Sequence, residues 1–312
     1  MELIRGLHNM RPRHRGCVVT IGAFDGVHLG HQAVIRHLLQ KSAELEVPSV
    51  VIVFEPLPRE YFAPIEAPAR IMSFREKFYA LRALGVDRLM RLRFNEQLRT
   101  MSAQQFLDDI FVGGLGVRYI VLGDDFRFGN DREGDLEFIK EQGRRYGYRA
   151  GPTPTESIDG ERVSSTRIRR ALEAADFAEA ERLLGRPYSI SGKVIYGRQL
   201  GQTIGTPTAN LELRRLRAPL SGVYAVEVSG AGLEAAWGVA NVGVRPTIDD
   251  SIKANLEVHL LDREIGLYGQ HIEVTFRHKL RDEQKFETME ELMLNIARDI
   301  DNTRAWFVRH QA

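Results

Sequence analysis

The stretch GAFDGVHLGHQ, residues 22–32, lies between an apolar run and a segment with helical spacing. The run that leads into it, CVVTIGAF, residues 17–24, has the composition of a buried strand. Glycine loses much conformational entropy on folding, so several glycines gather where a backbone must turn tightly or approach another group closely. In the segment that follows, apolar or small residues recur with helical spacing at Val34, Ile35, Leu38, Leu39, Ser42 and Leu45. The stretch is therefore predicted to be a tight loop between a first strand and a first helix.

The same alternation of β-rich runs and helical stretches continues to about residue 186. The expected strands are CVVTIGAF (17–24), PSVVIVF (48–54), VDRLMRLRF (86–94) and VRYIVLG (117–123). The expected helices are the segment after the opening loop, REKFYALRALG (75–85), a stretch around AQQFLDDIF (103–111), and Thr166 to Leu184. Strands that alternate with helices predict a doubly wound α/β fold, in which helices cover both faces of a parallel sheet.

In such a sheet the opening loop lies at the carboxyl ends of the strands, where α/β proteins bind ligands. Glycines let backbone N–H groups approach an anion, and the N-terminus of the next helix adds partial positive charge. His28 and His31 lie three positions apart at the start of that helix, so their side chains can point the same way. Two imidazoles there could hydrogen-bond phosphate oxygens and stabilise charge that develops on them. The alternative is a tight turn whose histidines cap the helix or satisfy carbonyl groups.

Beyond residue 186 short strands follow one another with no helix between them. The expected strands are SISGKVIYG (189–197), SGVYAVEVSG (221–230), AAWGVANVG (235–243), ANLEVHLLD (254–262) and HIEVTFRH (271–278). This pattern predicts an antiparallel barrel or sandwich. The chain ends in a helix with a Thr288–Glu291 capping box and an apolar stripe of Leu292, Ile296, Ile300 and Phe307. We therefore expect two domains, residues 1–186 and 187–312.

The composition limits the partners of the chain. Its 43 Lys and Arg nearly cancel its 42 Asp and Glu, so there is no overall basic footprint for nucleic acid or an anionic membrane. The longest stretch without these four residue types, Gln199 to Leu211, is too short and too polar to span a bilayer. Residues 1–16 lack an apolar signal core, and a single cysteine, Cys17, forms neither an intrachain disulfide nor a zinc cluster. We expect a soluble, cytoplasmic protein that binds small molecules; its oligomeric state stays open.

Three further stretches in the first half carry polar or aromatic groups beside expected strand or helix ends. FEPLP (54–58) ends the second expected strand, and GDDFRFG (123–129) follows the fourth. In SSTRIR (164–169), hydroxyls and exposed N–H groups at a helix start, together with Arg167 and Arg169, could clamp a phosphate. Each also has an ordinary structural explanation. Ser-Ser-Thr is a good N-cap, and phenylalanines at alternate positions are more often core residues.

A second candidate site lies in the β-rich half, in LGQTIGTPTANLEL (200–213). Gly201 and Gly205 flank a loop, which Thr208 and Asn210 follow. A threonine hydroxyl and an asparagine carbonyl are hard oxygen ligands that suit Mg²⁺ held together with phosphates. This stretch is therefore suited to bind Mg²⁺ together with phosphate groups.

The first half resembles the adenylyltransferase half of bacterial bifunctional riboflavin kinase/FAD synthetases. H-x-G-H after the first strand is a hallmark of nucleotidyltransferases related to class I aminoacyl-tRNA synthetases, and the string G-x-F-D-G-V-H-x-G-H is similar to that of this family. The resemblance implies a Rossmann-like domain that transfers AMP from ATP to FMN, with His28 and His31 catalytic. It implies that ATP is bound by Gly22, Phe24, Asp25, His28, His31, Ser164, Ser165, Thr166 and Arg169. It also implies that the flavin is bound by Phe54, Phe62, Asp125, Phe126 and Phe128.

The second half resembles riboflavin kinase. PTAN on a β-rich background, GVANVGVRPTI (238–248) and NLEVHLLDREIGLYGQHIEVTF (255–276) are similar to that domain. The resemblance implies that the γ-phosphate of ATP is transferred to riboflavin, with Glu257 as the general base that faces the 5′-hydroxyl. It implies that Mg²⁺ is held by Thr208 and Asn210, and that ATP is contacted by Gly205, Thr208 and Asn210. Flavin contacts are implied for Glu257 and Arg281.

Other interpretations of these residues stay open. A different H-x-G-H transferase, acting on pantetheine phosphate, nicotinate mononucleotide or a polyol phosphate, predicts neither PTAN nor a β-rich half. A flavin-binding carrier or regulator does not need the full set of oxygen and imidazole groups. Glu257 could be an exposed carboxylate on the outer face of a barrel, and HKLRDEQKF (278–286) a solvated loop. The sequence departs from the family pattern at Leu29, Glu55, Leu57 and Thr206, so no histidine at position 57 takes part in catalysis.

Overall fold

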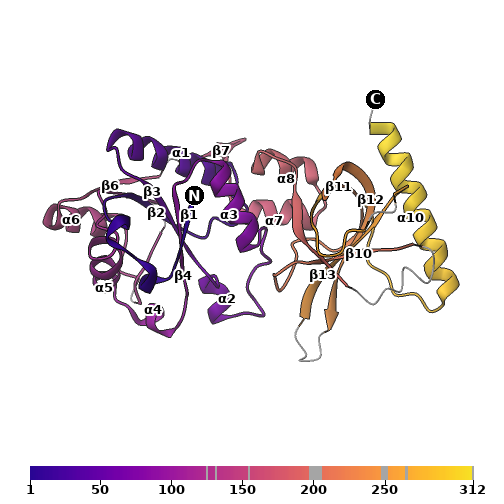
Figure 1. Cartoon of the computed structure of the whole chain (residues 1–312), viewed down its shortest axis with the longest axis horizontal. Helices are drawn as coiled ribbons and strands as arrows, with labels where there is room; N and C mark the ends of the chain where they lie inside the picture. Colours follow the sequence, from indigo (N-terminus) through magenta and orange to yellow (C-terminus); the bar gives the residue numbers. More distant parts are fainter. Residues whose placement is uncertain are drawn as a thin grey trace. The chain divides into compact units, whose positions relative to one another are not determined.

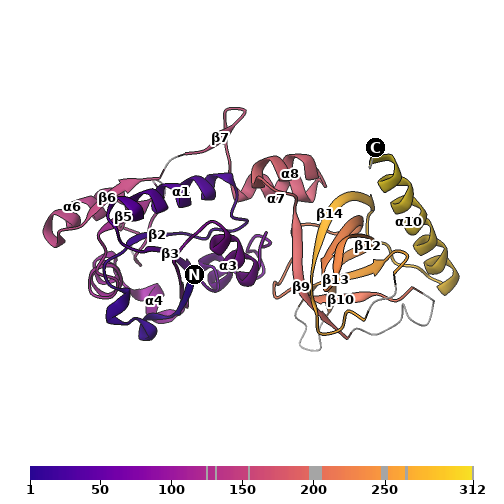
Figure 2. The same cartoon turned by 45° about the horizontal axis from the view of Figure 1, so that its top comes forward.

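The computed structural model of the protein describes residues 1–123, 126–130, 132–153, 155–196, 206–246, 252–263 and 266–310. The chain divides into two compact units (Figures 1 and 2). The first consists of Met1–Pro68 and Phe74–Ser164, and the second of Ala69–Ser73 and Ser165–Ala312. Residues 165–186 thus pack with the second unit, while the functional boundary at residue 186 stays a prediction.

The first unit is built on a six-stranded sheet in which neighbouring strands are parallel. The strand order is β1-β4-β3-β2-β5-β6. The strands are β1 (Glu2–Arg5), β2 (Val18–Ile21), β3 (Ser49–Phe54), β4 (Arg88–Leu92), β5 (Tyr119–Leu122) and β6 (Arg149–Pro152). The central four were predicted, and the doubly wound sheet is confirmed. The edge strands β1 and β6 were not predicted, because charged residues, and in β6 also glycine and proline, interrupt their apolar character.

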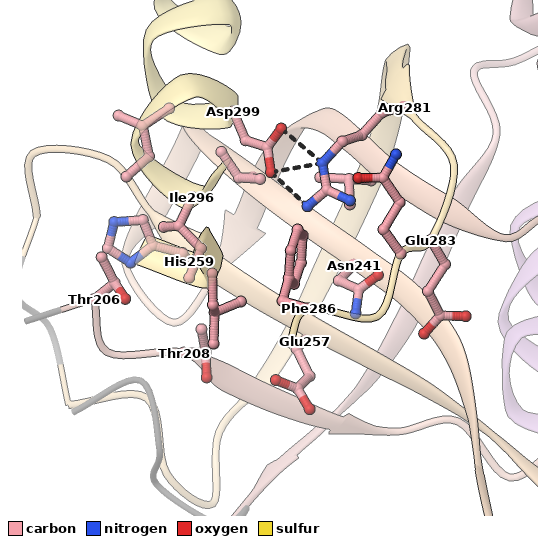
Figure 3. A pocket seen from close by; sticks show the side chains of 15 residues that line it. Thr206, Thr208, Asn241, Glu257, His259, Arg281, Glu283, Phe286, Ile296 and Asp299 are labelled. Atoms are coloured by element: carbon pink, nitrogen blue, oxygen red, sulfur yellow. Dashed lines mark hydrogen bonds and ion pairs between the residues drawn. The ribbon is translucent and has the colours of Figure 1, made fainter. Parts of the chain in front are cut away.

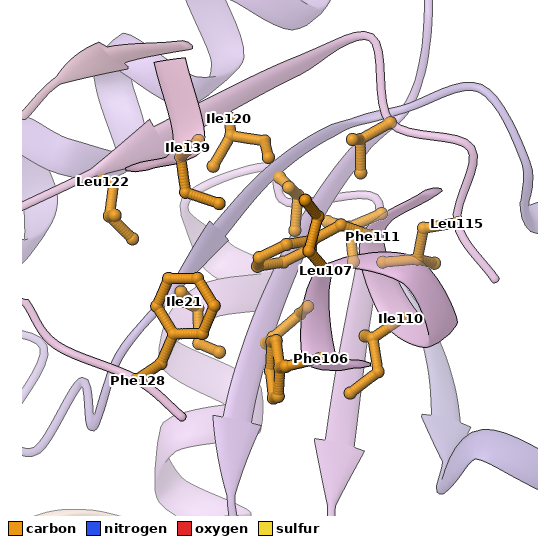
Figure 4. Close-up of a cluster of buried hydrophobic side chains, with 14 of the residues drawn as sticks. Ile21, Phe106, Leu107, Ile110, Phe111, Leu115, Ile120, Leu122, Phe128 and Ile139 are labelled. Carbon is orange, nitrogen blue, oxygen red and sulfur yellow. The ribbon is translucent and has the colours of Figure 1, made fainter. Parts of the chain in front are cut away.

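Helices cover both faces of this sheet. Strand side chains alternate between faces, so one set packs on α1 and the other forms a core with α5, η3 and α6. The helices are α1 (Leu29–Glu44), α2 (Pro58–Phe62), α3 (Phe74–Ala83), α4 (Glu96–Thr100), α5 (Ala103–Phe106), the π-helix η3 (Leu107–Val112) and α6 (Leu136–Tyr146). Short 3₁₀ turns, η1 (Leu7–Asn9) and η2 (Pro12–His14), and a hairpin of β7 (Ser157–Ile158) and β8 (Glu161–Arg162) complete the unit. Figure 4 shows the core that the sheet forms with α5, η3 and α6. Its labelled residues are Ile21, Phe106, Leu107, Ile110, Phe111, Leu115, Ile120, Leu122, Phe128 and Ile139.

The strand order positions the opening loop. From β2 the chain proceeds to β3 on one side, and β5 later pairs with the other side of β2. The carboxyl ends of β2 and β5 therefore lie at a topological switch point, where open α/β sheets form their ligand crevice. Residues 22–28 follow β2, and residues 123–135, of which 124, 125 and 131 are outside the described residues, follow β5.

The second unit is built on a closed antiparallel barrel in the order β10-β13-β12-β11-β14-β9. Its strands are β9 (Ser189–Ile195), β10 (Ala209–Glu212), β11 (Gly222–Gly230), β12 (Leu233–Pro246), β13 (Ile252–Leu260) and β14 (His271–Arg281). Its helices are α7 (Ser165–Glu173), α8 (Phe177–Leu184) and α10 (Met289–His310). Figure 2 shows α10 along the outside of the barrel, where it packs on β11, β12 and β14. The barrel and the terminal helix are confirmed.

Two local expectations were wrong. The helix predicted from Thr166 to Leu184 breaks into α7 and α8, because Ala175 has a left-handed φ of 55° and the Asp176 side chain caps the second helix. The capping box of α10 is only half formed. The Thr288 hydroxyl accepts the Glu291 N–H at 3.2 Å, but the Glu291 carboxylate accepts the N–H of Glu287.

Candidate active sites

The loop after β2 brings His28 and His31 together. Nδ1 of His28 caps α1 by accepting the N–H of His31 at 3.3 Å. The two imidazoles stack with ring centroids 3.6 Å apart, and the ring of Phe24 lies 5.0 Å from that of His31. A Cβ on Gly30 would approach the His28 ring and the carbonyl of Val163 to 3.2 Å, so glycine permits this close packing. The structure therefore shows that His28 caps the helix, whereas the ring of His31 takes no part in this cap. Phosphate binding by the two histidines stays a prediction.

His31 is a half-buried, neutral imidazole. Burial lowers its pKa well below 6.5, and the positive charges of His28, Lys77 and Arg162 lower it further. Its Nδ1 is buried and has no hydrogen-bond partner among the residues that the structure describes. A buried polar atom without a partner is uncommon in a folded protein and indicates that something else satisfies it. A phosphate-bearing ligand in front of α1 would supply that partner.

The backbone of this loop is held in an unusual conformation. Phe24 and Val27 have left-handed φ values of 47° and 42°, and the Gly26 between them has a φ of 90°. Side chains disfavour this region, so such a loop persists only where its surroundings fix it. Phe24 and Asp25 are both buried, with 3% and 2% of their surfaces exposed. Phe24 and Asp25, which were predicted to bind ATP, are therefore buried residues that help to hold the conformation of the loop.

Lys77 on α3 is a residue of this site that the sequence did not reveal. Its side chain is 1% exposed, and its Nζ donates a hydrogen bond to the carbonyl oxygen of Ala23 at 2.6 Å. The bond joins α3 to the loop after β2 across 54 positions of sequence. A buried ammonium carries a large desolvation cost unless it binds other polar groups, so its place beneath the loop is specific. The available signal was its position four residues before the buried Leu81, on the inner face of a helix.

A cavity of about 790 Å³ lies beside the loop after β2, and Gly22 and Ala23 of this loop line it. Aromatic rings line it from several elements, and four of them were predicted: Phe54, Phe62, Phe126 and Phe128. Phe128 lines this cavity and also belongs to the core, where its ring meets Phe106 and Phe111, so the core interpretation is confirmed and the flavin contact stays a prediction. Asp125 lies outside the described residues.

Four arginines also line this cavity, and the sequence analysis missed them. They come from α2, from α4 and from the loop after β5: Arg59, Arg99, Arg127 and Arg132. These three segments are far apart in the sequence, so no spacing pattern connects their arginines. Aromatic rings and guanidinium groups in one cavity of this size suit a ligand with both a flat ring system and a phosphate.

The SSTRIR segment spans the boundary of the two units, which falls between Ser164 and Ser165. Within the second unit, Nε of Arg169 donates to the carbonyl oxygen of Ala69 at 2.6 Å. The guanidinium of Arg167 pairs with Glu179 at 2.5 Å. Ser164 and Ser165 are half-buried and Thr166 is exposed. That this segment joins the histidines around one nucleotide stays a prediction.

A second cavity, of about 280 Å³, lies in the barrel unit (Figure 3). Predicted residues Thr208, Glu257 and Arg281 line it, together with side chains of β11, β12, α10 and the loop after β14. The predicted apolar stripe of α10 faces this cavity through Leu292, Ile296 and Ile300. Gly205 lies outside the described residues.

Glu257 faces this cavity because of strand alternation. Leu256 and Val258 are buried with 0% and 1% exposed, and Glu257 between them points to the opposite face of β13. It is thus on the outer face of the barrel, but α10 and the loop after β14 cover that face. Nδ2 of Asn255 donates to Oε1 of Glu257 at 2.9 Å, which orients the carboxylate.

Asn210 lies directly beside Glu257. The two residues are paired in register between β10 and β13. Asn210 is 5% exposed, and its Oδ1 has no hydrogen-bond partner among the described residues. Thr208 lines the cavity that Glu257 faces, whereas Asn210 is not among the side chains that line it. An unsatisfied amide oxygen, a hydroxyl and a carboxylate together form a donor set that fits Mg²⁺ and phosphate.

Arg281 forms a bidentate ion pair with Asp299 of α10. The N–O distances are 2.9 Å from Nη2 and 3.1 and 3.2 Å from Nε, and the guanidinium lies 5.5 Å from the centre of the Phe286 ring. Figure 3 shows the pair at the wall of the cavity. Residues 278–286 were predicted to form a loop, but residues 278–281 belong to β14, and Arg281 at the end of this strand is tied to α10.

The fold and these two cavities define a class of protein: a two-site transferase that uses nucleotides and a flat aromatic substrate. Residues 10–167 match the family model of FAD synthetase, and residues 184–307 match that of riboflavin kinase. The chain belongs to the family of bifunctional riboflavin kinase/FMN adenylyltransferases.

Relatives match over nearly the whole chain. The bifunctional riboflavin kinase/FMN adenylyltransferase of Pseudomonas fluorescens is 52% identical over 98% of this chain and 97% of that protein. That of Escherichia coli K12 is 47% identical over 98% of both chains. A solved structure described as a macrolide-efflux protein from Streptococcus pneumoniae has a TM-score of 0.75 and 29% identity, and the match covers 98% of this chain and 100% of that one. Among the described residues of this chain, no helix has the length and apolar character needed to cross a membrane.

Proposed function

We propose that the barrel unit phosphorylates riboflavin to FMN and that the sheet unit adenylylates FMN to FAD, each with its own ATP. The observation that carries the first reaction is a carboxylate, Glu257, in a covered cavity beside Thr208 and Asn210. The second reaction, the adenylylation of FMN, is supported by the stacked rings of His28 and His31. These rings belong to the loop and helix next to a cavity lined by aromatic rings and arginines. Both reactions consume ATP, which supports a cytoplasmic location.

In the kinase reaction Glu257 accepts the proton of the terminal hydroxyl of riboflavin. The hydroxyl oxygen forms a bond to the γ-phosphorus of ATP while the bond from that phosphorus to the ADP oxygen breaks. Asn255 holds the carboxylate in place for this proton transfer. Catalysis of this kind depends on alignment of the two substrates and on a base close to the attacking oxygen.

Thr208 and Asn210 would hold Mg²⁺ with the phosphates of ATP. The fit rests on the buried Oδ1 of Asn210, which has no partner among the described residues. When bound, the ion neutralises charge on the phosphate oxygens. Asparagine and threonine oxygens are hard ligands of the type that Mg²⁺ prefers.

In the adenylylation reaction a phosphate oxygen of FMN attacks the α-phosphorus of ATP, and pyrophosphate leaves. No protein nucleophile is required, because the attacking phosphate already carries negative charge. His28 and His31, at the N-terminus of α1, would stabilise the charge on the five-coordinate phosphorus. Nδ1 of His31, which has no hydrogen-bond partner among the described residues, would make this contact.

Product analysis tests the two activities directly. The protein is incubated with ATP, Mg²⁺ and riboflavin, and separately with ATP, Mg²⁺ and FMN, and flavins are separated by chromatography. We expect FMN and FAD from riboflavin, and FAD from FMN. Unchanged riboflavin would contradict the kinase assignment, and unchanged FMN would contradict the adenylyltransferase assignment.

Substitution of Asn210 tests the magnesium site. We expect Asn210→Ala to lower the rate of riboflavin phosphorylation about 100-fold, because a hard ligand of the ion is lost. FAD formation from FMN stays unchanged, since Asn210 belongs to the other unit. Raising the Mg²⁺ concentration should restore part of the kinase rate. Asn302→Ala, on the exposed side of α10, is the matched control; a kinase rate in Asn210→Ala equal to that of this control would exclude the assignment.

Lys77 is expected to hold the adenylylation site in shape. Lys77→Met removes the hydrogen bond to Ala23 at nearly constant volume, and we expect the rate of FAD formation from FMN to fall about tenfold or more. Lys77→Arg should retain more activity, because it keeps the charge. Riboflavin phosphorylation by the same sample serves as the control. Equal rates of FAD formation in wild type and Lys77→Met would show that the bond has no role in the reaction.

A further inference from the structure

Three polar side chains lie in one row across the barrel wall. Strand β13 is flanked by β10 and β12, and Glu257 is paired in register with Asn210 on one side and with Asn241 on the other. Residues paired across neighbouring strands have Cβ atoms about 5 Å apart, so both amides lie within one side-chain length of the carboxylate. Asn210 has a role in the proposed function, and Asn241 has none so far.

Asn241 has the properties of a ligand-binding group. Its neighbours Ala240 and Val242 are buried with 0% and 1% exposed, and Asn241 lies on the opposite face of β12, where it lines the cavity. Its Oδ1 is buried and has no hydrogen-bond partner among the described residues. Figure 3 shows the amide above Glu257 and next to Phe286. Because buried polar groups are normally satisfied, this oxygen indicates a hydrogen-bond donor supplied by a bound molecule.

The row has two chemically different sides. On the side of β10, Thr208 and Asn210 present hard oxygens of the kind that bind a magnesium-phosphate group. On the side of β12, the cavity is bounded by Val239, the ring of Phe286 and apolar side chains of α10, together with the Arg281–Asp299 ion pair and Glu283. The phosphate donor therefore belongs on the first side of Glu257, and a substrate with an apolar ring system on the second. Asn241 lies on the second side, within reach of the part of the substrate that joins the ring to the attacking hydroxyl.

We propose that Asn241 binds the secondary hydroxyl groups of the ribityl chain of riboflavin and thereby directs the terminal hydroxyl to Glu257. This inference rests on the proposed kinase function of the barrel. A primary amide offers one acceptor and two donor hydrogens, and a hydroxyl can serve as both donor and acceptor, so the amide matches a polyol chain. The isoalloxazine ring would occupy the apolar part of the cavity and would not depend on Asn241.

The experiment compares riboflavin with lumiflavin, which has the same ring system but a methyl group in place of the ribityl chain. In the full-length protein, the KM for riboflavin and the inhibition constant of lumiflavin against phosphorylation are measured for wild type, Asn241→Ala and Asn241→Ser. We expect Asn241→Ala to raise the KM for riboflavin about tenfold, the effect of losing a buried hydrogen bond, and to change the lumiflavin constant less than about twofold. Asn241→Ser keeps a polar group and should give a smaller rise in KM.

Two controls separate binding from folding. Trp237 and Trp306 are the two tryptophans of the chain, and Trp237 stacks on Phe307 of α10 at 4.9 Å, so their fluorescence reports the fold of the barrel unit. Asn255→Ala should instead lower kcat with a smaller effect on KM, because Asn255 contacts Glu257. If either folded variant at position 241 has the KM of wild type, or if KM and the lumiflavin constant rise together, the inference is overturned. A wild-type protein that leaves riboflavin unphosphorylated would overturn the proposed function itself.

Discussion

Glu257→Gln is expected to abolish the phosphorylation of riboflavin and to leave the conversion of FMN into FAD intact. The carboxylate faces a cavity shielded by α10 and is held at 2.9 Å by Asn255. The glutamine amide has nearly the same shape and can still accept that hydrogen bond, but it cannot take a proton from the substrate. Loss of a general base lowers such rates by about 10²- to 10⁴-fold.

The measurement is the formation of FMN and FAD by the same sample with riboflavin or FMN as acceptor. Glu273→Gln, at an exposed position of β14, is the matched control, since it makes the same chemical change outside the cavity. If Glu257→Gln lost both activities while remaining folded, the assignment of two independent sites would be wrong. If it kept the kinase rate, another group would be the base.

The double variant His28→Ala, His31→Ala is expected to have the opposite effect. FAD formation from FMN should fall by about 10³-fold or more, because two groups that stabilise phosphate charge are lost, while riboflavin phosphorylation continues. The measurement is again product analysis with each acceptor. His37→Ala, on the same helix but away from the loop, is a suitable control. FAD formation by the double variant at the wild-type rate would refute the assignment of these residues.

The pH dependence of the wild-type enzyme adds a second test of His31. Burial and the nearby positive charges lower the pKa of His31 well below 6.5, so the ring is neutral at pH 7 and stays neutral as the pH falls through 6.5. We therefore expect protonation of His31 to reduce FAD formation only well below pH 6.5. His31→Asn, which keeps a hydrogen-bond donor, should retain more activity than His31→Ala. A loss of activity centred at pH 6.5 or above that disappears in His31→Asn would contradict the neutral state.

Much of the fold follows from local patterns in the sequence. The apolar runs of β2, β3, β4 and β5 and the helical spacing of α1 and α3 are periodicities of short segments, and they predict the doubly wound sheet without knowledge of its partners. The antiparallel barrel follows from strands without intervening helices. Alternation along β13 predicts the side on which Glu257 lies, because that depends only on its two neighbours. The stripe on α10 likewise predicts the face that covers the cavity.

The tertiary structure decided which distant groups meet. The pairing of Glu257 with both Asn210 and Asn241 depends on the register of three strands, which no local pattern contains. The hydrogen bond from Lys77 to Ala23 and the ion pair of Arg281 with Asp299 join segments that are separate in the sequence. The break between α7 and α8 also escaped prediction, since a left-handed alanine carries no compositional signal.

The sequence by itself thus determined the type and order of the central strands, of α1 and α3 and of most barrel strands, because periodicity and turn chemistry act over a few positions. Only the tertiary structure decided which buried polar atoms lack partners and which charges are paired. Those properties depend on how segments far apart in the chain pack, and burial makes them energetically important because water can no longer satisfy the groups involved.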